Sequence, residues 1–351
     1  MSGARTRPDV DVLVAGGGPV GLAVAIEARL AGLRTVVVEP RTTPIDKACG
    51  EGLMPGAVAA LARLGVHPAG HPLTGIRYLS GDRAADHLFT GATGLGVRRT
   101  ALHLALAIRA EELGVEVLAG KVDTVAQDAG SVTAAGIRAA WLMACDGLHS
   151  TVRRQLGLDR PARAAHRRRY GIRRHYRVAP WTDLVEVHWG RHVEAYVTPV
   201  APDVVGVALL GPPHHDYDRS LDSFPDLRRH LGAAPTLGPP RGAGPLLQRT
   251  SARTAGRVRL VGDASGYVDA LTGEGVRVGL AQATAAVRTL GPDVDRSSAE
   301  YEKAWTAATR DYRLITSGLV AAAGSPLRRS IVPLAAAAPG LYGGIVERLA
   351  R

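Results

Sequence analysis

The sequence predicts an α/β fold in which parallel strands alternate with helices, with an inserted antiparallel sheet and helices at the C-terminal end. Two observations indicate the α/β part: glycine-rich turns within residues 14–23 and 261–279, each placed between a strand-like and a helix-like segment. A third observation indicates the inserted sheet, because residues 184–200 alternate between apolar and polar side chains. Such alternation is typical of antiparallel strands with one solvated face.

Length and charge limit the function classes. With 351 residues the chain has room for roughly two domains, and its net charge of +11 favours anionic ligands such as dinucleotides and acidic lipid surfaces. Cys49 and Cys145 are far apart and form no disulfide framework, which is typical of a reducing compartment. The segment "MSGARTRPDV" has no apolar core of a secretory signal, so we expect a cytoplasmic protein.

The first turn has the spacing of a dinucleotide site. Residues 10–15 form a buried-strand pattern, and "PVGLAVAIEARLAGL" has the apolar period of a helix that begins at Pro19. Between them Gly16, Gly18 and Gly21 follow the G-x-G-x-x-G pattern, which lets a backbone and a helix N-terminus approach a pyrophosphate. Glu39 ends the next strand and is a suitable acceptor for a ribose diol.

The second turn indicates which group forms the other half of the dinucleotide. "RVRLVGDAS" is a strand pattern that ends at Gly262 and Asp263, and this carboxylate can accept hydrogen bonds from a polyol such as a ribityl chain. A helix is expected to begin near Thr272, after which Gly273 and Gly275 follow. Its positive N-terminus suits the anionic edge of a reduced flavin. Together the two turns predict FAD, with one end of the dinucleotide at each turn.

At these residues the chain resembles FAD-dependent monooxygenases of the aromatic hydroxylase type (p-hydroxybenzoate hydroxylase-like) and the related geranylgeranyl reductases. A third matching motif is "ACDGLHSTVRR", and the family links its Asp146 to FAD. A looser match is "VRRTALHLAL", where the resemblance implies that Arg99 contacts FAD. The resemblance further implies a Rossmann-type FAD-binding domain, and NADH or NADPH as reductant.

Residues 47–66 are similar to the segment that passes the flavin ring in this superfamily. In the prenyl reductases this segment commonly carries a Cys-Gly pair, as Cys49-Gly50 does here. Two interpretations stay open, because Cys49 is equally well explained as a small core residue beside a glycine turn. Glu51 is the only carboxylate of the segment, and a role near the substrate is the less favoured interpretation. No catalytic residue is identified beyond these two weak candidates.

The predicted domains are discontinuous. We expect the FAD-binding domain to comprise residues 1–75, 98–160 and 250–295, the substrate-binding sheet 76–97 and 161–249, and a C-terminal helical segment 296–351. Residues 298–324 predict one long helix, and the final segment predicts a second, shorter one. The apolar runs near the end are too short to span a bilayer, but they are compatible with a helix that lies on a membrane surface.

Side chains of the inserted sheet give weaker signals. Trp189, Tyr196 and Val197 are candidates to face the substrate, although an ordinary core or surface position is favoured for each. His188 and His192 are four residues apart, a spacing that converges on a helix but not along a strand, so no metal site is expected.

An arginine cluster follows the Asp-Gly motif. A solvated charged face is its favoured interpretation, and the alternatives are the 2′-phosphate of NADPH, an acidic lipid surface or nucleic acid. Because no aromatic residues interleave, we expect no nucleic-acid partner. The cluster consists of Arg167, Arg168, Arg169, Arg173, Arg174 and Arg177.

The leading functional hypothesis is an FAD-dependent monooxygenase, a hydroxylase or epoxidase that acts through a flavin C4a-hydroperoxide. Few aromatic and many aliphatic residues favour a lipophilic aromatic, polyketide or terpenoid substrate, with O₂ as co-substrate. The first alternative is a prenyl alkene reductase, and an alternative of another class is a non-catalytic FAD-binding protein. The sequence does not distinguish NADH from NADPH, or either of them from an external reductase.

Overall fold

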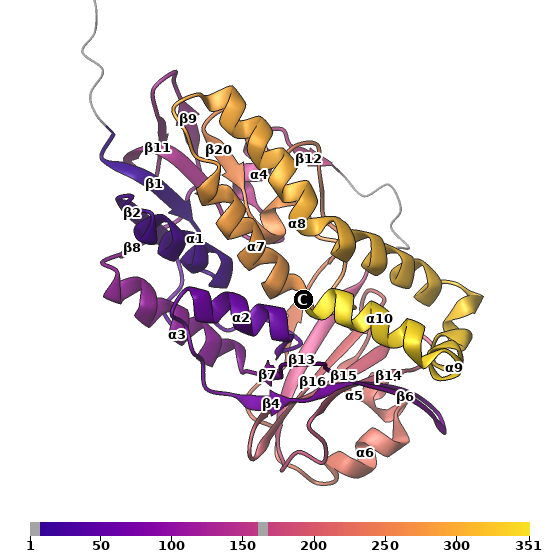
Figure 1. Ribbon diagram of the computed structural model, residues 1–351. Coiled ribbons are helices and arrows are strands. Elements are labelled where there is room, and N and C mark those ends of the chain that lie inside the picture. Colours follow the sequence, from indigo (N-terminus) through magenta and orange to yellow (C-terminus); the bar gives the residue numbers. More distant parts are fainter. Residues whose placement is uncertain (1–7, 161–167) are drawn as a thin grey trace, which may run out of the picture.

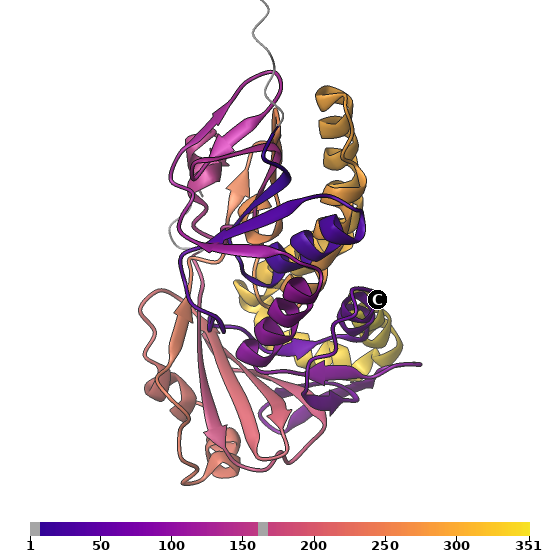
Figure 2. The ribbon, with the colours of Figure 1, turned by 90° about the vertical axis from the view of Figure 1, so that its left-hand side faces the viewer.

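The computed structural model describes residues 8–160 and 168–351, which form two large β-sheets with helices packed around them (Figures 1 and 2). The first sheet has a five-stranded parallel core, as the α/β prediction requires. In spatial order its strands are β20 (Val258–Leu260), β11 (Ile137–Ala144), β1 (Val10–Ala15), β2 (Thr35–Glu39) and β8 (Glu116–Ala119). Antiparallel strands at its periphery are β19 (Thr254–Ala255), β10 (Val132–Ala134) and β9 (Val125–Gln127).

Both faces of the inner strands of this sheet are covered, which explains the apolar runs of β1 and β2, whereas the edge strand β8 is exposed. Val12 and Val14 of β1 face one group of helices, whereas Leu13 faces the side of β9 and β10. All three side chains have 0% exposure. The helices on the first face are α1 (Pro19–Leu30), α3 (Arg99–Glu112), α7 (Gly275–Arg288) and α8 (Val294–Ala323). Helix α4 (Thr151–Gln155) contributes to the other face.

The second sheet is mainly antiparallel and contains the strands that alternation predicted. Its order is β17 (Arg241–Ala243), β13 (Tyr170–Arg177), β16 (Val204–Gly211), β15 (Glu194–Ala201), β14 (Leu184–Trp189), β5 (Gly75–Ser80) and β6 (Arg83–Leu88). One face, with Ala195 and Val197, packs on α5 (Tyr217–Asp222) and α6 (Pro225–Leu231). The other face, with Trp189 and Tyr196, packs toward α8 and the segment that follows it.

The C-terminal part begins as predicted, with the single long helix α8. The prediction of one shorter helix after it is wrong, because Pro326 and Pro339 each start a new element. These elements are the 3₁₀ turn η3 (Pro326–Ser330), α9 (Ile331–Ala337) and α10 (Pro339–Ala350). Within the described residues no single helix is long and apolar enough to cross a bilayer. Residues 326–337 and 339–350 together have the required length and composition, but they are bent by 101° relative to each other.

Short elements connect the two sheets. A small sheet lies between them, and its strands are β3 (Gly52–Leu53), β7 (Gly94–Gly96) and β4 (His71–Leu73). Strands β12 (Asp159–Arg160) and β18 (Arg249–Thr250) pair separately. Helix α2 (Pro55–Arg63) follows β3, and the 3₁₀ turn η2 (Gly262–Ser265) follows β20. The chain therefore passes several times between the two sheets, where the candidate site lies.

Candidate functional site

Four parallel strands end at the same edge of the first sheet. The segments that follow β1, β2, β11 and β20 meet there because neighbouring parallel strands place their carboxyl ends together. Ligands of open α/β sheets bind outside these carboxyl ends. The predicted residues Gly16, Glu39, Asp146 and Asp263 each follow or end one of these strands, so the fold brings together motifs that are up to 247 positions apart.

The first turn requires glycine at two positions. Gly16 has φ of +100°, and a Cβ on Gly21 would lie 1.8 Å from the Gly16 carbonyl oxygen. A Cβ on Gly18, in contrast, would meet nothing within 4 Å, which leaves room for a ligand beside the backbone. Pro19 is the first residue of α1, whose N-terminus points to this space. The turn therefore has the shape and polarity to bind a pyrophosphate.

Glu39 is fixed in place at the end of β2. Its Oε2 accepts from the Gly17 backbone N at 2.7 Å, and its Oε1 accepts from the backbone N and the guanidinium of Arg41. Burial alone would raise the pKa of this carboxyl, but these hydrogen bonds outweigh burial and hold it below the ordinary value. His103 of α3 contacts the carbonyl of Gly17 at 2.9 Å and holds the turn from the other side. The carboxylate is thus ionised and held beside the first turn.

The second turn is connected to the Asp-Gly motif by Arg153. This side chain is 1% exposed, and its Nη1 donates to the carbonyl of Ala264 at 3.1 Å while Nη2 donates to the carbonyl of Leu148 at 2.9 Å. Gln282 of α7 accepts from the backbone N of Gly262 at 2.6 Å. The motif quoted from the sequence includes Arg153, but its contact with Ala264, 111 positions away, could not be predicted; sequence reasoning missed Gln282 altogether.

Two carboxylates face the cavity between the turns. Asp263 pairs with Lys47 at 3.2 Å. Asp146 accepts from the backbone N of Val152 through Oδ2, whereas its Oδ1 is buried with no hydrogen-bond partner among the described residues. The Nε atom of Arg99, which also lines the cavity, is likewise buried without a partner there. These unsatisfied atoms fit a polyhydroxylated, phosphate-bearing ligand, since buried polar groups are costly when unpaired.

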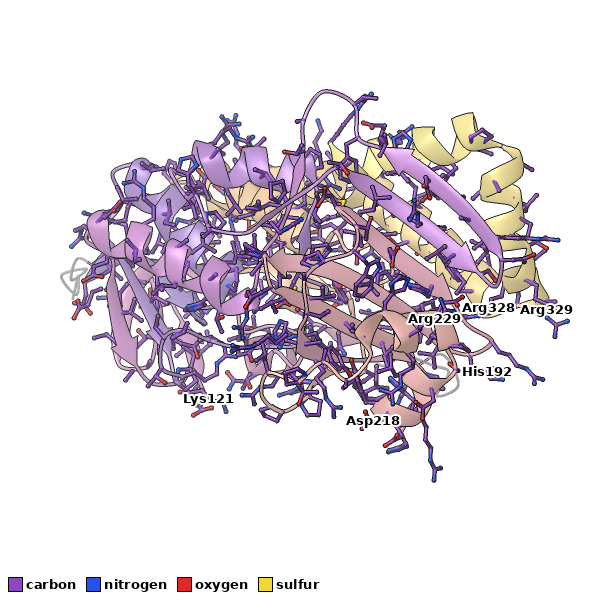
Figure 3. All side chains as sticks on the ribbon, turned by 90° about the horizontal axis from the view of Figure 1, so that it is seen from below. Lys121, His192, Asp218, Arg229, Arg328 and Arg329 are labelled. Carbon is purple, nitrogen blue, oxygen red and sulfur yellow. The ribbon has the colours of Figure 1, made fainter. Side chains whose placement is uncertain are left out.

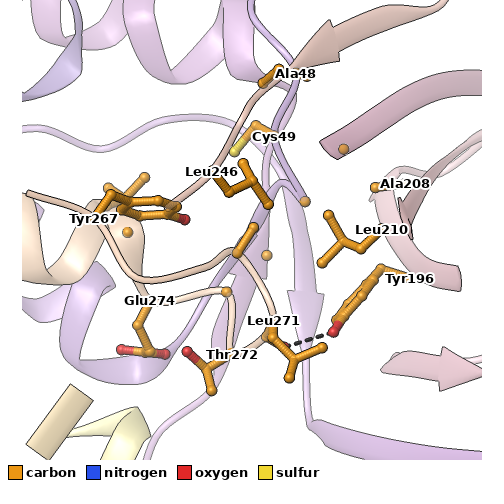
Figure 4. Close-up of a pocket in the computed structure, with 18 of the residues that line it drawn as sticks. Ala48, Cys49, Tyr196, Ala208, Leu210, Leu246, Tyr267, Leu271, Thr272 and Glu274 are labelled. Carbon is orange, nitrogen blue, oxygen red and sulfur yellow. Dashed lines mark hydrogen bonds between the residues drawn. The ribbon is translucent and has the colours of Figure 1, made fainter. Parts of the chain in front are cut away.

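The flavin-end turn differs slightly from its prediction. Helix α7 begins at Gly275, three residues after Thr272, because Gly273 has φ of +72° and ends any earlier helical turn. Thr272 Oγ1 lies 2.9 Å from Thr316 Oγ1 of α8, which fixes the turn against that helix. Figure 4 shows Thr272 and Glu274 on one side of the cavity and Cys49 and Tyr267 farther along it.

Glu274 is a buried acid immediately before α7. Its Oε2 pairs with Arg277, while Oε1 is buried and has no hydrogen-bond partner in the described part of the chain. Burial raises the pKa of this carboxyl to about 7, and Arg277 only partly opposes that effect. An acid with this pKa exchanges protons near neutral pH, and sequence reasoning did not single it out.

Glu51 lies in a buried network that joins the two sheets. It is one of the few non-glycine residues with a left-handed backbone, at φ of +62°, and its side chain is 1% exposed. Its Oε2 lies 2.6 Å from Nε2 of His175, and its Oε1 accepts from the backbone N of Arg99 at 2.8 Å. Because Arg173 can only donate, its contact at 2.9 Å makes Nδ1 of His175 an acceptor, so the proton on Nε2 points to Glu51.

Cys49 and Tyr196 also line the cavity. Cys49 is half-buried and accepts from the backbone N of Glu51. The Tyr196 hydroxyl donates to the carbonyl of Leu271 at 2.7 Å, which attaches the second sheet to the flavin-end turn. Trp189 is buried outside the cavity lining, and Val197 faces α5 and α6. Of the three candidate substrate-facing residues, only Tyr196 is therefore at the cavity.

The arginine cluster is solvated only in part. Arg168 and Arg177 are exposed, as a solvated face requires, and the partly buried Arg174 pairs with Asp218. Arg173 is buried and pairs with Asp46, and Arg169 lies largely buried between Glu194 and Asp269, because β13 packs on neighbouring strands. Arg167 lies outside the described residues. Burial also raises the pKa of the Asp269 carboxyl to about 6, although Arg169 opposes that effect.

One cavity of about 1140 Å³ connects these groups. At one end it is lined by Gly18, Asp146 and Asp263, and in the middle by Cys49, Glu51 and the 272–275 turn. Its far end is apolar and is formed by the second sheet and the C-terminal helices. The lining residues at that end include Ile76, Tyr78, Leu210, Leu319, Leu334, Leu341 and Tyr342. The volume exceeds that of most small-molecule sites, so a dinucleotide and an apolar molecule fit together.

Comparisons with known proteins agree with this geometry. Residues 9–196 match the family described as FAD binding domain. A menaquinone reductase from Mycolicibacterium smegmatis is 33% identical over 82% of this chain and 78% of its own length. A 12-dehydrotetracycline 5-monooxygenase/anhydrotetracycline 6-monooxygenase from Streptomyces rimosus is 34% identical over 44% of this chain, and the match covers 34% of that enzyme.

A solved structure extends the similarity to the whole fold. A geranylgeranyl bacteriochlorophyll reductase-like protein from Thermoplasma acidophilum superimposes with a TM-score of 0.78 at 20% identity, covering 93% of this chain and 90% of that protein. Both sheets and the C-terminal helices therefore belong to one shared architecture.

Proposed function

Because the chain belongs to the FAD binding domain family and is a flavin-dependent oxidoreductase that uses FAD, we propose that it is a monooxygenase of a lipophilic substrate. The observation that carries the proposal is the continuous cavity, which runs from the flavin-end turn to the apolar C-terminal helices. An apolar site limits the access of water to an oxygen-transfer reaction. The similarity to the tetracycline monooxygenase supports a polyketide or aromatic substrate.

The proposed cofactor contacts follow the two turns. We assign the pyrophosphate and adenosine half to Gly16, Gly18, Pro19, Gly21, Glu39 and Arg99. Asp146, Gly262 and Asp263 serve the ribityl region, and Thr272, Gly273 and Gly275 serve the flavin edge. The positive end of α7 favours negative charge at that edge. The bound FAD, once reduced by NADH or NADPH, supplies the activation of O₂.

We also propose that the chain is divided into an FAD-binding domain of residues 1–75, 98–160 and 250–295, an inserted substrate-binding sheet and a C-terminal helical segment. We further propose a cytoplasmic location, contact with a membrane surface and electron supply from an external reductase.

A second candidate function is reduction of an isolated alkene. Two observations favour it: the menaquinone reductase matches most of this chain, and the cavity is lined by one group that exchanges protons near neutral pH, Glu274. Alkene reduction adds a hydride and a proton, so it needs an acid. Glu274, with a pKa of about 7, is the candidate for this acid.

The two reactions are distinguished by the atoms they add. The FAD-loaded protein is incubated with NADPH or NADH, oxygen-18 gas and a panel of long-chain phenols and polyprenyl quinones, and products are analysed by mass spectrometry. Incorporation of one labelled oxygen atom, with O₂ consumed in proportion, supports the monooxygenase. Addition of two hydrogen atoms to a side-chain alkene, located by fragmentation and distinct from reduction of the quinone ring, supports the alkene reductase, and oxidation of the reductant without any product contradicts both.

A further inference from the structure

The C-terminal helices expose large apolar side chains to solvent. Leu314 of α8 is 71% exposed, Leu327 of η3 63%, Leu334 of α9 64%, and Leu341 and Ile345 of α10 69% and 40%. We call these five residues the leucine surface. They make up five of the eleven large apolar side chains that are exposed in the described chain, although they lie within 32 residues of sequence. Contiguous exposed apolar surface of this kind marks an interaction site.

The same stretch contains no acidic residue. Residues 312–346 include three arginines and neither aspartate nor glutamate, although acids make up 32 of the 351 residues of the chain. Arg328 is held by Glu194 and by the carbonyl of Gly190. Arg329 is exposed, forms no ion pair within the described residues, and projects from the same end of the molecule as Arg328 and His192 (Figure 3). Asp311 and Glu347 border this stretch, and they pair with Arg348 and His87. An apolar stretch that has a free basic group, Arg329, and no acid of its own complements an anionic lipid layer.

The leucine surface lies at the mouth of the cavity. Leu314, Leu334, Leu341 and Ile345 line the cavity and are also exposed, so they belong at once to its wall and to the outer surface. The shared wall shows that residues of α8, α9 and α10 gather around one opening. A molecule that leaves a bilayer beneath this surface reaches the flavin-end turn through an apolar path.

Another exposed apolar pair provides a comparison. Leu104 and Ile108 lie one turn apart on α3 and are 45% and 48% exposed. Glu111 and Glu112 follow on the same helix, and neither apolar residue lines the cavity. Leu104 and Ile108 therefore differ from the leucine surface in two ways: acidic residues are close in sequence, and no opening of the cavity lies beside them.

We propose that the leucine surface docks the protein on an anionic lipid bilayer, and that the substrate passes from the lipid into the cavity through this opening. The first half of this proposal depends only on the surface, whereas the second half rests on the proposed function. In the docked orientation the leucines enter the interfacial layer and Arg329 contacts lipid phosphates. The two parallel-sheet turns lie at the other end of the cavity, where water-borne NADH or NADPH has access from solution.

The test is flotation of the full-length, FAD-loaded protein with vesicles. Vesicles of phosphatidylcholine mixed with phosphatidylglycerol should bind the protein, and pure phosphatidylcholine vesicles should bind it much more weakly. Replacement Leu334→Glu with Leu341→Glu should lower the vesicle partition coefficient by about tenfold or more, since each replacement removes apolar surface from the lipid contact and adds a negative charge. Leu104→Glu with Ile108→Glu is the matched control and should bind as the wild type does.

Several results would overturn the docking proposal. These are absence of binding to anionic vesicles, equal binding to both kinds of vesicle, or equal loss in the control variant. Self-association that Leu334→Glu with Leu341→Glu abolishes, in the absence of vesicle binding, would show that a second copy covers the surface. FAD content and thermal unfolding midpoint verify that each variant is folded. Because flotation requires no turnover, a failure of the proposed reaction leaves this test intact.

Discussion

At the scale of single residues, the main finding is that buried charged groups surround the cavity. Glu51 contacts His175 of β13 and the first residue of α3, so one carboxylate connects the segment of residues 47–66, helix α3 and the second sheet. The sequence marked Glu51 as a weak candidate but could not indicate this arrangement. His175 is 124 positions away, and no periodic pattern connects the two residues.

Replacement Glu51→Ala is expected to destabilise the protein by about 3 to 5 kcal/mol, because it leaves Arg173 and the Nε2 proton of His175 buried with fewer acceptors. Denaturant unfolding, followed by flavin fluorescence, measures the loss. Glu51→Gln keeps one acceptor oxygen and should lie between the wild type and the alanine variant. Glu112→Ala, on the exposed end of α3, is the control. An unfolding free energy for Glu51→Ala equal to that of this control would refute the assigned role.

Because the pKa of Glu274 is raised, we expect the free energy of unfolding to depend on pH. Its pKa is raised from the ordinary 4.5 to about 7, so between these values the folded protein holds a proton that the unfolded chain has lost. The contribution of this group to stability therefore falls as pH rises through that interval. Relative to Glu274→Gln, the wild type should lose up to about 3 kcal/mol between pH 5 and pH 8.

Urea unfolding of both proteins at pH 5 and pH 8 measures this difference. The carboxyls with lowered pKa, such as Glu39 and Asp46, are ionised at both pH values and cancel from the comparison. Glu300→Gln, on the exposed side of α8, serves as the control variant. A difference between wild type and Glu274→Gln that stays constant with pH would contradict the buried, protonated state.

At the scale of elements, local patterns predicted far more than long-range contacts did. The strands β1, β2 and β14 to β16, the helices α1 and α8, and both glycine turns follow from hydrophobic periodicity and turn spacing, which neighbouring residues determine. Helix α7 starts later than predicted because a glycine turn precedes it. A proline separates α9 from α10, where a single helix was predicted. The burial of Arg169 and Arg173 was not predicted, because it depends on the strands that pack beside β13, which the local sequence does not specify.

Arg153 provides a test of how elements cooperate at the cofactor site. It joins the Asp-Gly motif, η2 and Asp159 by hydrogen bonds to five separate groups. Arg153→Lys keeps the charge but loses the guanidinium fork, so the η2 turn should shift. We expect FAD affinity to fall at least about tenfold, consistent with the loss of one or two hydrogen bonds to a charged group.

Fluorescence titration of the deflavinated protein with FAD measures this change. The adjacent Arg154→Lys variant is the matched control, because Arg154 is exposed and its only described side-chain bond is to Thr151 within the same helix. Equal FAD affinity in the two variants would show that the η2 turn does not depend on Arg153.

At the scale of the whole molecule, the two sheets and the C-terminal helices enclose one continuous space. The parallel sheet provides the polar end, the second sheet provides Tyr196 and Leu210, and α8 to α10 provide the apolar end. No single motif encodes this cavity, because residues from positions 18 to 349 line it. The sequence could therefore predict the cofactor from its turns, but only the folded chain shows how far the apolar space extends.

If a lipophilic substrate lies in the same cavity as the flavin, its binding alters the surroundings of the flavin. Titration of the FAD-loaded protein with alkylphenols of increasing chain length, followed by the flavin absorbance spectrum, tests this. We expect a spectral change on binding and a dissociation constant that falls about three- to fourfold for each added methylene until the chain fills the cavity. Affinities that do not depend on chain length, or binding that leaves the flavin spectrum unchanged, would contradict it.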